Sequence, residues 1–197
     1  MAFFTAIGTI SNDIVRRETK NGVVTTFRLE TGAPGGRKIW IDVECWGHLA
    51  GTVAYHGETG RALAVSGELA QKEWRDPHGD RRARRLVQLS QAYFMPRPVA
   101  ASTCENTFLI AGRVHCDPTT TSAGSGLKLE LTLCSNRRHG SRHRLAVPAT
   151  IWRPNADRLP DIKAGQELSA SGSLSVSKTK GLVFEIRSLQ TFVASER

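Results

Sequence analysis

The chain of 197 residues lacks the signals that carry a protein into or across a membrane. It contains no run of about 18 apolar residues, so no segment is long enough to span a bilayer as a helix. The N-terminal stretch MAFFTAIGTI has no basic region ahead of its apolar residues, and polar residues interrupt it, which argues against a secretory signal. We therefore expect a cytoplasmic protein.

Paired cysteines and the motifs of catalysis are also missing. The four cysteines, Cys45, Cys104, Cys116 and Cys134, form no CxxC pair and no cluster with histidine at zinc spacing, so we expect reduced thiols. Neither the GxSxG elbow of hydrolases nor the GxxxxGK[ST] loop of nucleotide-binding proteins occurs. The sequence predicts a protein that is not an enzyme and needs no metal or cofactor.

Acidic residues are few relative to basic ones. The chain has 27 Lys and Arg against 18 Asp and Glu, a formal net charge of +9 with a pI near 9.9. The excess is spread over both halves of the chain and is not gathered in a tail. Such a distributed surplus indicates two electropositive surfaces, for which nucleic acid is the commonest ligand.

The chain contains one internal repeat. Residues 3–13 (FFTAIGTISND) resemble residues 107–117 (TFLIAGRVHCD), and residues 43–69 resemble residues 148–174. Three aligned pairs are Gly8 with Gly112, Gly67 with Gly172, and Trp46 with Trp152. Because the separation between aligned residues drifts little, two related domains explain the sequence better than one large fold.

A change of character separates the two copies. Pro96 and Pro98 cannot donate to a sheet, and small residues follow them, so this stretch is predicted to be an extended connector. The predicted organisation is an N-terminal domain at 1–95, a linker at 96–105 and a C-terminal domain at 106–197.

Short alternating runs predict five strands in each half. The first half has them at 3–10, 22–31, 37–46, 61–70 and 81–94, and the second at 107–115, 127–135, 143–152, 166–177 and 181–194. A segment between the third and fourth strands of each half has room for a short helix. This order predicts an all-β protein of two tandem five-stranded oligonucleotide-binding (OB) barrels. The aligned glycines fall within strands, where a glycine usually marks a bulge or a sharp bend.

Specific motifs in the first half resemble a known family. They are IGTISNDIVRRETKNGVVTTFRLET, KIWIDVECWGHLAGTVAYH, GRALAVSGELAQKEWRDPHGDRR and the closing strand LVQLSQAYFM. Their order resembles the bacterial-type single-stranded DNA-binding (SSB) proteins, and the second half resembles the same family more faintly. The resemblance implies that single-stranded DNA is the partner. It also implies a homodimer, because SSB proteins with two OB domains pair to assemble four OB folds.

Binding single strands without sequence preference requires aromatic planes for bases and cations for phosphates. Trp40 and Trp46 share one face of a predicted strand, and Trp74 lies in the predicted hairpin AQKEWRDPHGDRRARR. The family resemblance places these tryptophans at stacking positions, whereas packing at a strand end is the alternative. The predicted phosphate contacts around them are Arg28, Lys72, Arg75, Arg81, Arg82, Arg84 and Arg85.

The second half offers a thinner set of candidates. Trp152 aligns with Trp46, and the loop NRRHGSRHR supplies four arginines, Arg137, Arg138, Arg142 and Arg144. The last hairpin, SVSKTKGL, keeps Lys178 and Lys180 but has no aromatic residue. Two interpretations stay open: the second domain binds DNA more weakly, or it serves mainly in subunit assembly.

Asp42 and Glu44 are unexpected between two tryptophans of a basic protein. In one interpretation they pair with cations such as Arg28 and hold them in place; in the other they accept hydrogen bonds from base amino groups. A third possibility, a Mg²⁺-dependent nuclease, lacks a further carboxylate, lysine or histidine at a telling spacing.

Two departures from the family bear on partners. The loop TGAPGGRK lacks a stacking aromatic, and the chain ends at LQTFVASER, without an acidic tip for recruiting repair proteins. We therefore expect no recruitment through such a tail. An OB accessory factor that binds RNA or a protein partner is the alternative function, since stacking and phosphate contacts serve RNA equally well.

Overall fold

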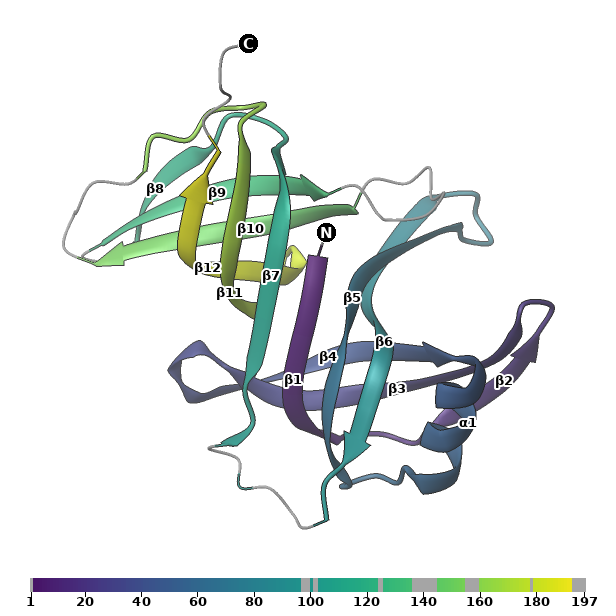
Figure 1. Ribbon diagram of the computed structural model, residues 1–197. Helices are drawn as coiled ribbons and strands as arrows, with labels where there is room; N and C mark the ends of the chain where they lie inside the picture. The colour runs from purple at the N-terminus through teal and green to yellow at the C-terminus, as the bar shows by residue number, and fades with distance from the viewer. Residues whose placement is uncertain are drawn as a thin grey trace. The chain divides into compact units, whose positions relative to one another are not determined.

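The computed structural model describes residues 2–96, 100, 103–123, 126–135, 145–154, 160–177 and 179–192. They form two compact units, one of Phe3–Asn106 and one of Thr107–Arg197 together with Met1–Ala2. Strands dominate both units, as Figure 1 shows. Within the described residues, no helix has the length and apolar character needed to cross a membrane.

The first unit is a closed five-stranded barrel with one added strand and one helix. Its elements are β1 (Ala2–Ile10), β2 (Val15–Thr19), β3 (Gly22–Ala33), β4 (Arg37–Trp46), α1 (Gly47–His56), β5 (Ala62–Arg75) and β6 (Arg81–Phe94). A short 3-10 turn, Pro34–Gly36, joins β3 to β4. The barrel closes in the order β1–β5–β6–β4–β3–β1, with β4 and β6 parallel and the other pairs antiparallel.

Alternation of apolar residues builds the core of this barrel. Along β1, every second side chain is buried, and Phe4 is fully enclosed. On β4, Ile39, Ile41 and Val43 point inward, as the alternation predicts. The intervening residues of β4 are therefore left on the outer face.

Helix α1 packs Ala50 and Val53 against the barrel. The buried hydroxyl of Thr25 on β3 donates to the carbonyl oxygen of Ala50 at 2.9 Å, which ties the helix to the barrel wall. Gly57 ends the helix, and its N–H donates to the carbonyl of Val53 at 2.9 Å. The predicted helix between the third and fourth barrel strands is thus present in the first unit.

The second unit repeats the barrel. Its strands are β7 (Asn106–Val114), β8 (Thr119–Ala123), β9 (Gly126–Ser135), β10 (Leu145–Pro154), β11 (Glu167–Ser177) and β12 (Gly181–Thr191). The barrel closes in the order β7–β11–β12–β10–β9–β7, again with one parallel pair, β10 with β12. Phe108 and Phe184 meet edge to face in its core, with ring centroids 4.9 Å apart.

The helix predicted in the second unit is not found in the described residues. Residues 160–165 of that segment are turn and coil, while residues 155–159 lie outside the description. The described part is short, and Gly165 at its end has a φ of 82°, outside the right-handed helical region.

The aligned glycines occupy equivalent places in the two barrels. A Cβ at Gly8 would lie 2.3 Å from the Glu30 carbonyl oxygen, and one at Gly112 would lie 2.4 Å from that of Cys134. Gly67 and Gly172 lie where the strand register shifts, opposite bulges at Ser90 of β6 and Arg187 of β12. Register shifts are thus present at two of the four glycines, and the other two mark close approaches between strands. Because each feature recurs at the aligned position, the internal repeat is structural.

Sequence patterning missed two strands, β2 and β8. Every residue of β2 is exposed, so its sequence VRRET carries no apolar alternation. The TTTSA sequence of β8 is likewise polar. Each pairs with one barrel strand, β2 with β3 and β8 with β9, and β5 runs to Arg75, past its predicted end at residue 70. The other barrel strands lie close to their predicted ranges.

We expect Gly67→Ala to destabilise the first unit. The new Cβ would lie 2.2 Å from the Gln88 carbonyl oxygen, so the backbone of β6 must move, at about 1–3 kcal/mol. Urea unfolding followed by circular dichroism measures the loss. Gly51→Ala in α1 is the matched control, because nothing lies within 4 Å of its Cβ, and it should be neutral or stabilising. Equal stability of the two variants would contradict the packing argument.

Candidate nucleic-acid interface

The outer face of β3 and β4 gathers aromatic and charged side chains in register. Trp40 lies opposite Glu30, Asp42 opposite Arg28, Glu44 opposite Thr26, and Trp46 opposite Val24. Directly paired residues share a face of a sheet. The two acids therefore lie between the two tryptophans on the outside of the barrel, as the alternation predicts.

Asp42 holds two arginines from the strands on either side of it. Arg28 Nε on β3 lies 3.3 Å from Asp42 Oδ1. Arg84 on β6 makes a two-pronged contact, with Nε 2.8 Å from Oδ2 and Nη2 2.6 Å from Oδ1. Such fork geometry fixes the direction of a guanidinium as well as its position.

Glu44 ties a lysine and a tryptophan together. Its side chain is buried, and Oε1 accepts a hydrogen bond of 2.7 Å from Trp46 Nε1, while Oε2 pairs with Lys72 Nζ on β5. The Lys72 ammonium lies 5.9 Å from the centroid of the Trp46 ring. Both carboxylate oxygens are thus engaged, so Glu44 anchors the indole and the lysine side by side.

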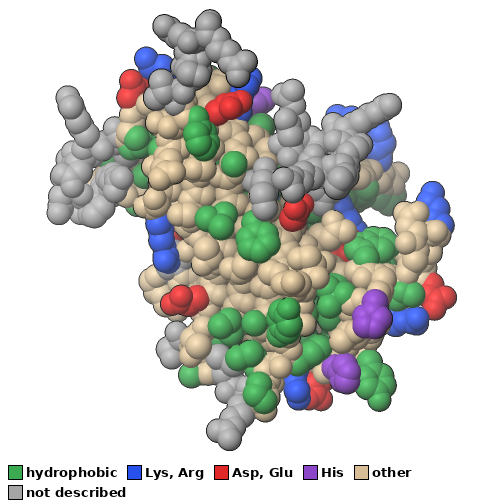
Figure 2. Space-filling view, viewed as in Figure 1, with side chains coloured by type: hydrophobic (Ala, Val, Ile, Leu, Met, Phe, Trp, Pro, Cys, Tyr) green, Lys and Arg blue, Asp and Glu red, His purple; other side chains and the backbone are tan. Residues whose placement is uncertain are grey.

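These contacts decide between the two interpretations of the acids in favour of the first. Asp42 and Glu44 pair with the protein's own cations, including the predicted partner Arg28. The same mixing of charge is visible in Figure 2, where red and blue side chains lie next to each other at several places on the surface.

Three of the four tryptophans are about half exposed. The exposed fractions are 49% for Trp40, 47% for Trp74 and 48% for Trp152, and Trp46 is partly buried. A tryptophan used purely for packing covers more of its ring. Each of these rings therefore keeps surface on which a base can stack.

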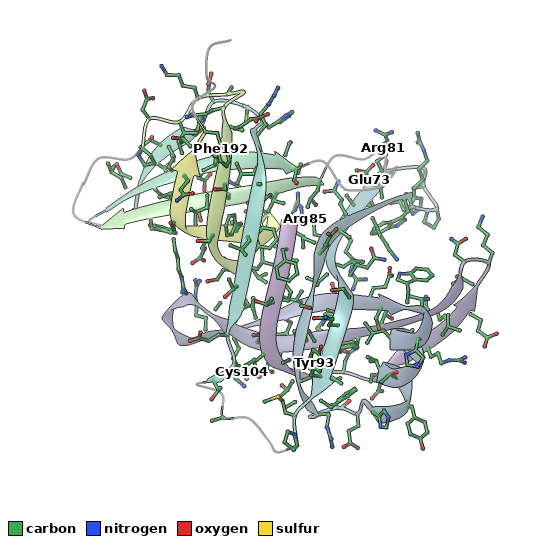
Figure 3. The ribbon with its side chains drawn as sticks, viewed as in Figure 1. Glu73, Arg81, Arg85, Tyr93, Cys104 and Phe192 are labelled. Carbon is green, nitrogen blue, oxygen red and sulfur yellow. The ribbon has the colours of Figure 1, made fainter. Side chains whose placement is uncertain are left out.

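The β5–β6 hairpin is a two-stranded ribbon whose two faces differ. Register pairs Lys72 with Arg84 and Trp74 with Arg82, which places these four side chains on one face. The other face carries Gln71, Glu73, Arg75, Arg81 and Arg85; Figure 3 labels three of these residues. The six predicted cations of the hairpin are therefore divided, three with Trp74 and three opposite.

Local contacts shape the cations of this hairpin. Arg82 Nε pairs with Asp76 at 2.9 Å, and Asp76 also accepts the backbone N–H groups of His78 and Asp80 that close the turn. Arg75 donates to the Gly79 carbonyl at 2.9 Å. Arg85 is less exposed than Arg81, Arg82 and Arg84, and its burial lowers the pKa of its guanidinium.

The second barrel has its own cluster around Trp152. Lys128 on β9 lies directly opposite Trp152, with Nζ 5.5 Å from the ring centroid. Glu130 pairs with both Lys128 and Lys180, the latter at 2.6 Å, and these hydrogen bonds lower the pKa of the Glu130 carboxyl. Lys128 and Glu130 were missed from sequence. Their place beside Trp152 becomes visible only once the register of β9 on β10 is known.

The remaining predicted residues of this unit lie outside the described residues. They are Arg137, Arg138, Arg142, Arg144 and Lys178.

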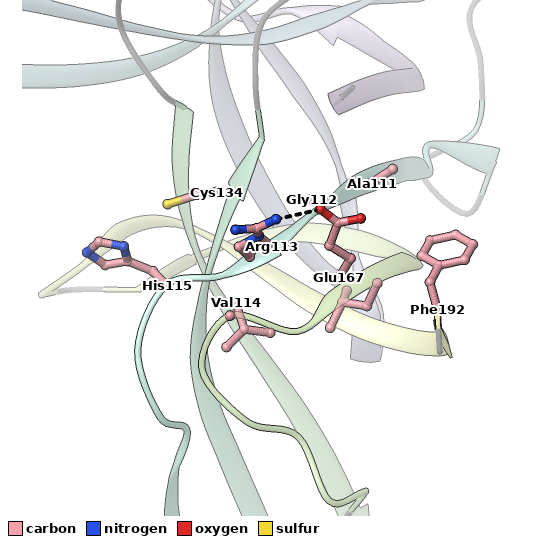
Figure 4. Close-up of a pocket in the computed structure, with 10 residues that line it drawn as sticks. Ala111, Gly112, Arg113, Val114, His115, Cys134, Glu167 and Phe192 are labelled. Carbon is pink, nitrogen blue, oxygen red and sulfur yellow. Dashed lines mark hydrogen bonds and ion pairs between the residues drawn. The ribbon is translucent and has the colours of Figure 1, made fainter. Parts of the chain in front are cut away.

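A cavity of about 640 Å³ lies elsewhere in the second unit, along β7, β9 and β11. An ion pair of 2.9 Å between Arg113 and Glu167 lies in it, and the exposed ring of Phe192 lines one side (Figure 4). Of the predicted DNA contacts that the structure describes, none lines this cavity. Among the residues that the structure describes, no three His, Cys, Asp or Glu side chains are grouped to hold a metal.

Comparison with known proteins gives a family match in the first unit. Residues 1–95 match the model of the single-strand binding protein family. A search of curated protein sequences gave no match for the chain.

Two solved structures of the single-stranded DNA-binding protein from Thermus aquaticus share the fold over the whole chain. A deletion mutant of that protein superposes with a TM-score of 0.80 at 17% identity, covering 100% of this chain and 97% of that one. The wild-type form gives 0.79 at 18% identity, with coverages of 100% and 95%. These likenesses confirm the predicted all-β oligonucleotide-binding fold.

Removal of the Glu44 carboxylate should destabilise the first unit. Glu44→Ala leaves the Trp46 N–H and the Lys72 ammonium without their partner, and we expect a loss of about 1–3 kcal/mol in the free energy of unfolding of the first unit. Urea titration measures it. The control is Glu30→Ala, which removes a pair with the more exposed Lys38 and should cost less than about 1 kcal/mol. If the two variants lose the same stability, Glu44 has no special anchoring role.

Proposed function

We propose that the protein binds single-stranded DNA without strong sequence preference, stacking bases on tryptophans and pairing phosphates with lysine and arginine. The observation that carries this proposal is the outer face of β3 and β4, where Glu44 holds the Trp46 ring beside Lys72. The family matched by residues 1–95 and the likeness to the single-stranded DNA-binding protein from Thermus aquaticus support the same ligand. The protein acts by binding and not as an enzyme.

The DNA path we propose runs over the Trp46 face and onto the hairpin face that bears Trp74. Stacking on an aromatic ring contributes about 1–3 kcal/mol per base and tolerates any base. Lys72, Arg82 and Arg84 lie on that hairpin face for phosphates, with Arg28 close to Asp42. Trp40 lies on the same face of β4 as Trp46, at the other end of the two acids.

The second domain is proposed to take part in binding as well as assembly. Trp152 offers a half-exposed ring beside two lysines held by Glu130, the same combination of stacking surface and cations as around Trp46. A protein with this ligand would protect exposed single strands in replication, recombination, repair or DNA transfer.

Replacement of Trp46 and Trp74 together by Ala should weaken binding to a dT oligomer by about 2–6 kcal/mol, because each ring stacks one base. Fluorescence anisotropy of a labelled oligomer measures this. Trp74→Ala alone keeps the test independent of folding, since Trp74 lies on the hairpin beyond the barrel. Tyr55→Ala is the matched control: this ring is 84% exposed on α1, away from the proposed path, and its loss should leave affinity unchanged.

The same titration separates the alternatives. Unchanged affinity of the Trp46/Trp74 double variant would reduce both rings to packing residues. Equal or stronger binding of an rU oligomer would favour an RNA-binding accessory factor. Binding of dT should weaken as salt is added, because counterions released from the phosphates must be recaptured.

We further propose a homodimer, which would bring four OB barrels together. Sedimentation velocity of the protein alone should then give a mass near twice 21.6 kDa. A single species at 21.6 kDa over the micromolar range would overturn the dimer while leaving the DNA-binding proposal intact.

A further inference from the structure

Strand β2 forms a basic arm beside the proposed binding face. It pairs with β3 along one edge, all of its residues are exposed, and its sequence VRRET brings Arg16 and Arg17 onto a strand, with Lys20 in the turn that follows. Nothing in the sequence patterning predicted this strand. The proposed DNA path over Trp46 and Trp74 does not include β2.

Strand register places Arg17 in the same row as Trp46. Arg17 pairs with Val24 on β3, and Val24 pairs in turn with Trp46 on β4. Paired residues share a face, and neighbouring strands lie about 4.8 Å apart, so the Cα atoms of Arg17 and Trp46 are separated by roughly 10 Å. An extended arginine on this row reaches the phosphate of a nucleotide whose base stacks on Trp46.

Arg16 has the opposite orientation. It pairs with Thr25, whose fully buried hydroxyl is bonded to helix α1, so Arg16 belongs to the other face of β2. Its guanidinium is also engaged with Glu18 at 3.1 Å. Two adjacent arginines of one arm therefore differ in the face they occupy.

Arg17 differs from the other cations near Trp46 because no carboxylate of the described residues pairs with it. Lys72 is paired with Glu44, and Arg28 and Arg84 with Asp42. Arg17 makes no ion pair or hydrogen bond through its side chain within the described part of the chain. A phosphate that meets Arg17 therefore gains an attraction that no carboxylate of the protein already shares.

The second barrel supports the importance of this row. There the residue in the position of Arg17 is Thr121, but its partner on the next strand, Lys128, lies directly opposite Trp152. In each barrel, then, the tryptophan at this position on the third barrel strand has a cation in its own row. The cation is two strands away in the first barrel and one strand away in the second.

We propose that Arg17 is a further DNA-contacting residue, binding the phosphate of the nucleotide stacked on Trp46 and extending the DNA path onto β2. The inference rests on the proposed function, since it presupposes that single-stranded DNA occupies the Trp46 face. Lys72 approaches the same ring from β5, so the nucleotide would lie between a cation on each side.

The test compares Arg17→Ala with Arg16→Ala in the full-length protein, using a fluorescently labelled dT oligomer over a range of salt concentrations. We expect Arg17→Ala to weaken binding about three- to tenfold at low salt and to make the salt slope less negative by about 0.7, the value for one phosphate on a single strand. Arg17→Lys should restore the slope. Arg16→Ala removes the same charge from the other face and should change affinity less than twofold.

Each outcome supports or overturns the inference. Equal losses in the two alanine variants would mean that β2 acts through general charge, and no loss in either would place the DNA elsewhere; both results overturn the role of Arg17. Trp46→Ala in the same series separates this from the proposed function. If the wild type binds and Trp46→Ala weakens binding while Arg17→Ala does not, only the contact on β2 fails; if the wild type does not bind dT, the proposed function fails first.

Discussion

The proposed binding face depends on one buried carboxylate. Glu44 accepts the indole N–H of Trp46 and pairs with Lys72, so a single side chain from β4 fixes both a stacking surface and a cation. Without it, the tryptophan would lack a hydrogen-bond partner and the lysine would be an unrestrained surface charge. Asp42 has the corresponding role two residues earlier, where it joins arginines of β3 and β6. The acids of a basic protein thus organise its cations.

The cost of this organisation is that most of the cations beside Trp46 are already paired. A phosphate approaching Arg28 or Arg84 has to share the guanidinium with Asp42, whereas one approaching an unpaired cation does not. The net charge of +9 is therefore a poor guide to the proposed DNA path. A better guide is a cation that lies near an exposed tryptophan and is not paired with a carboxylate.

The two barrels show the same scaffold with different functional side chains. Their register shifts at Gly67 and Gly172 coincide, because a Cβ at either position would collide with the backbone of the neighbouring strand. Their lysine clusters do not coincide. Lys72 reaches Trp46 from β5, whereas Lys128 reaches Trp152 from β9. Backbone crowding constrains the glycines to one place. A long lysine side chain reaches the ring from the paired strand β9 in one barrel and from β5, beyond β6, in the other.

The sequence by itself determined the strands with apolar alternation, their order along the chain, the repeat and the tryptophans on the outer face of β4. The strands and their faces follow from a period of two residues, and the repeat from glycines and tryptophans at matching positions. Tertiary structure alone decided that Glu44 serves Trp46 and Lys72, that the hairpin arginines divide between two faces, and that β2 exists. Those features depend on strand register and on contacts between residues far apart in the chain. A polar strand such as β2 has no apolar alternation from which its existence could be predicted.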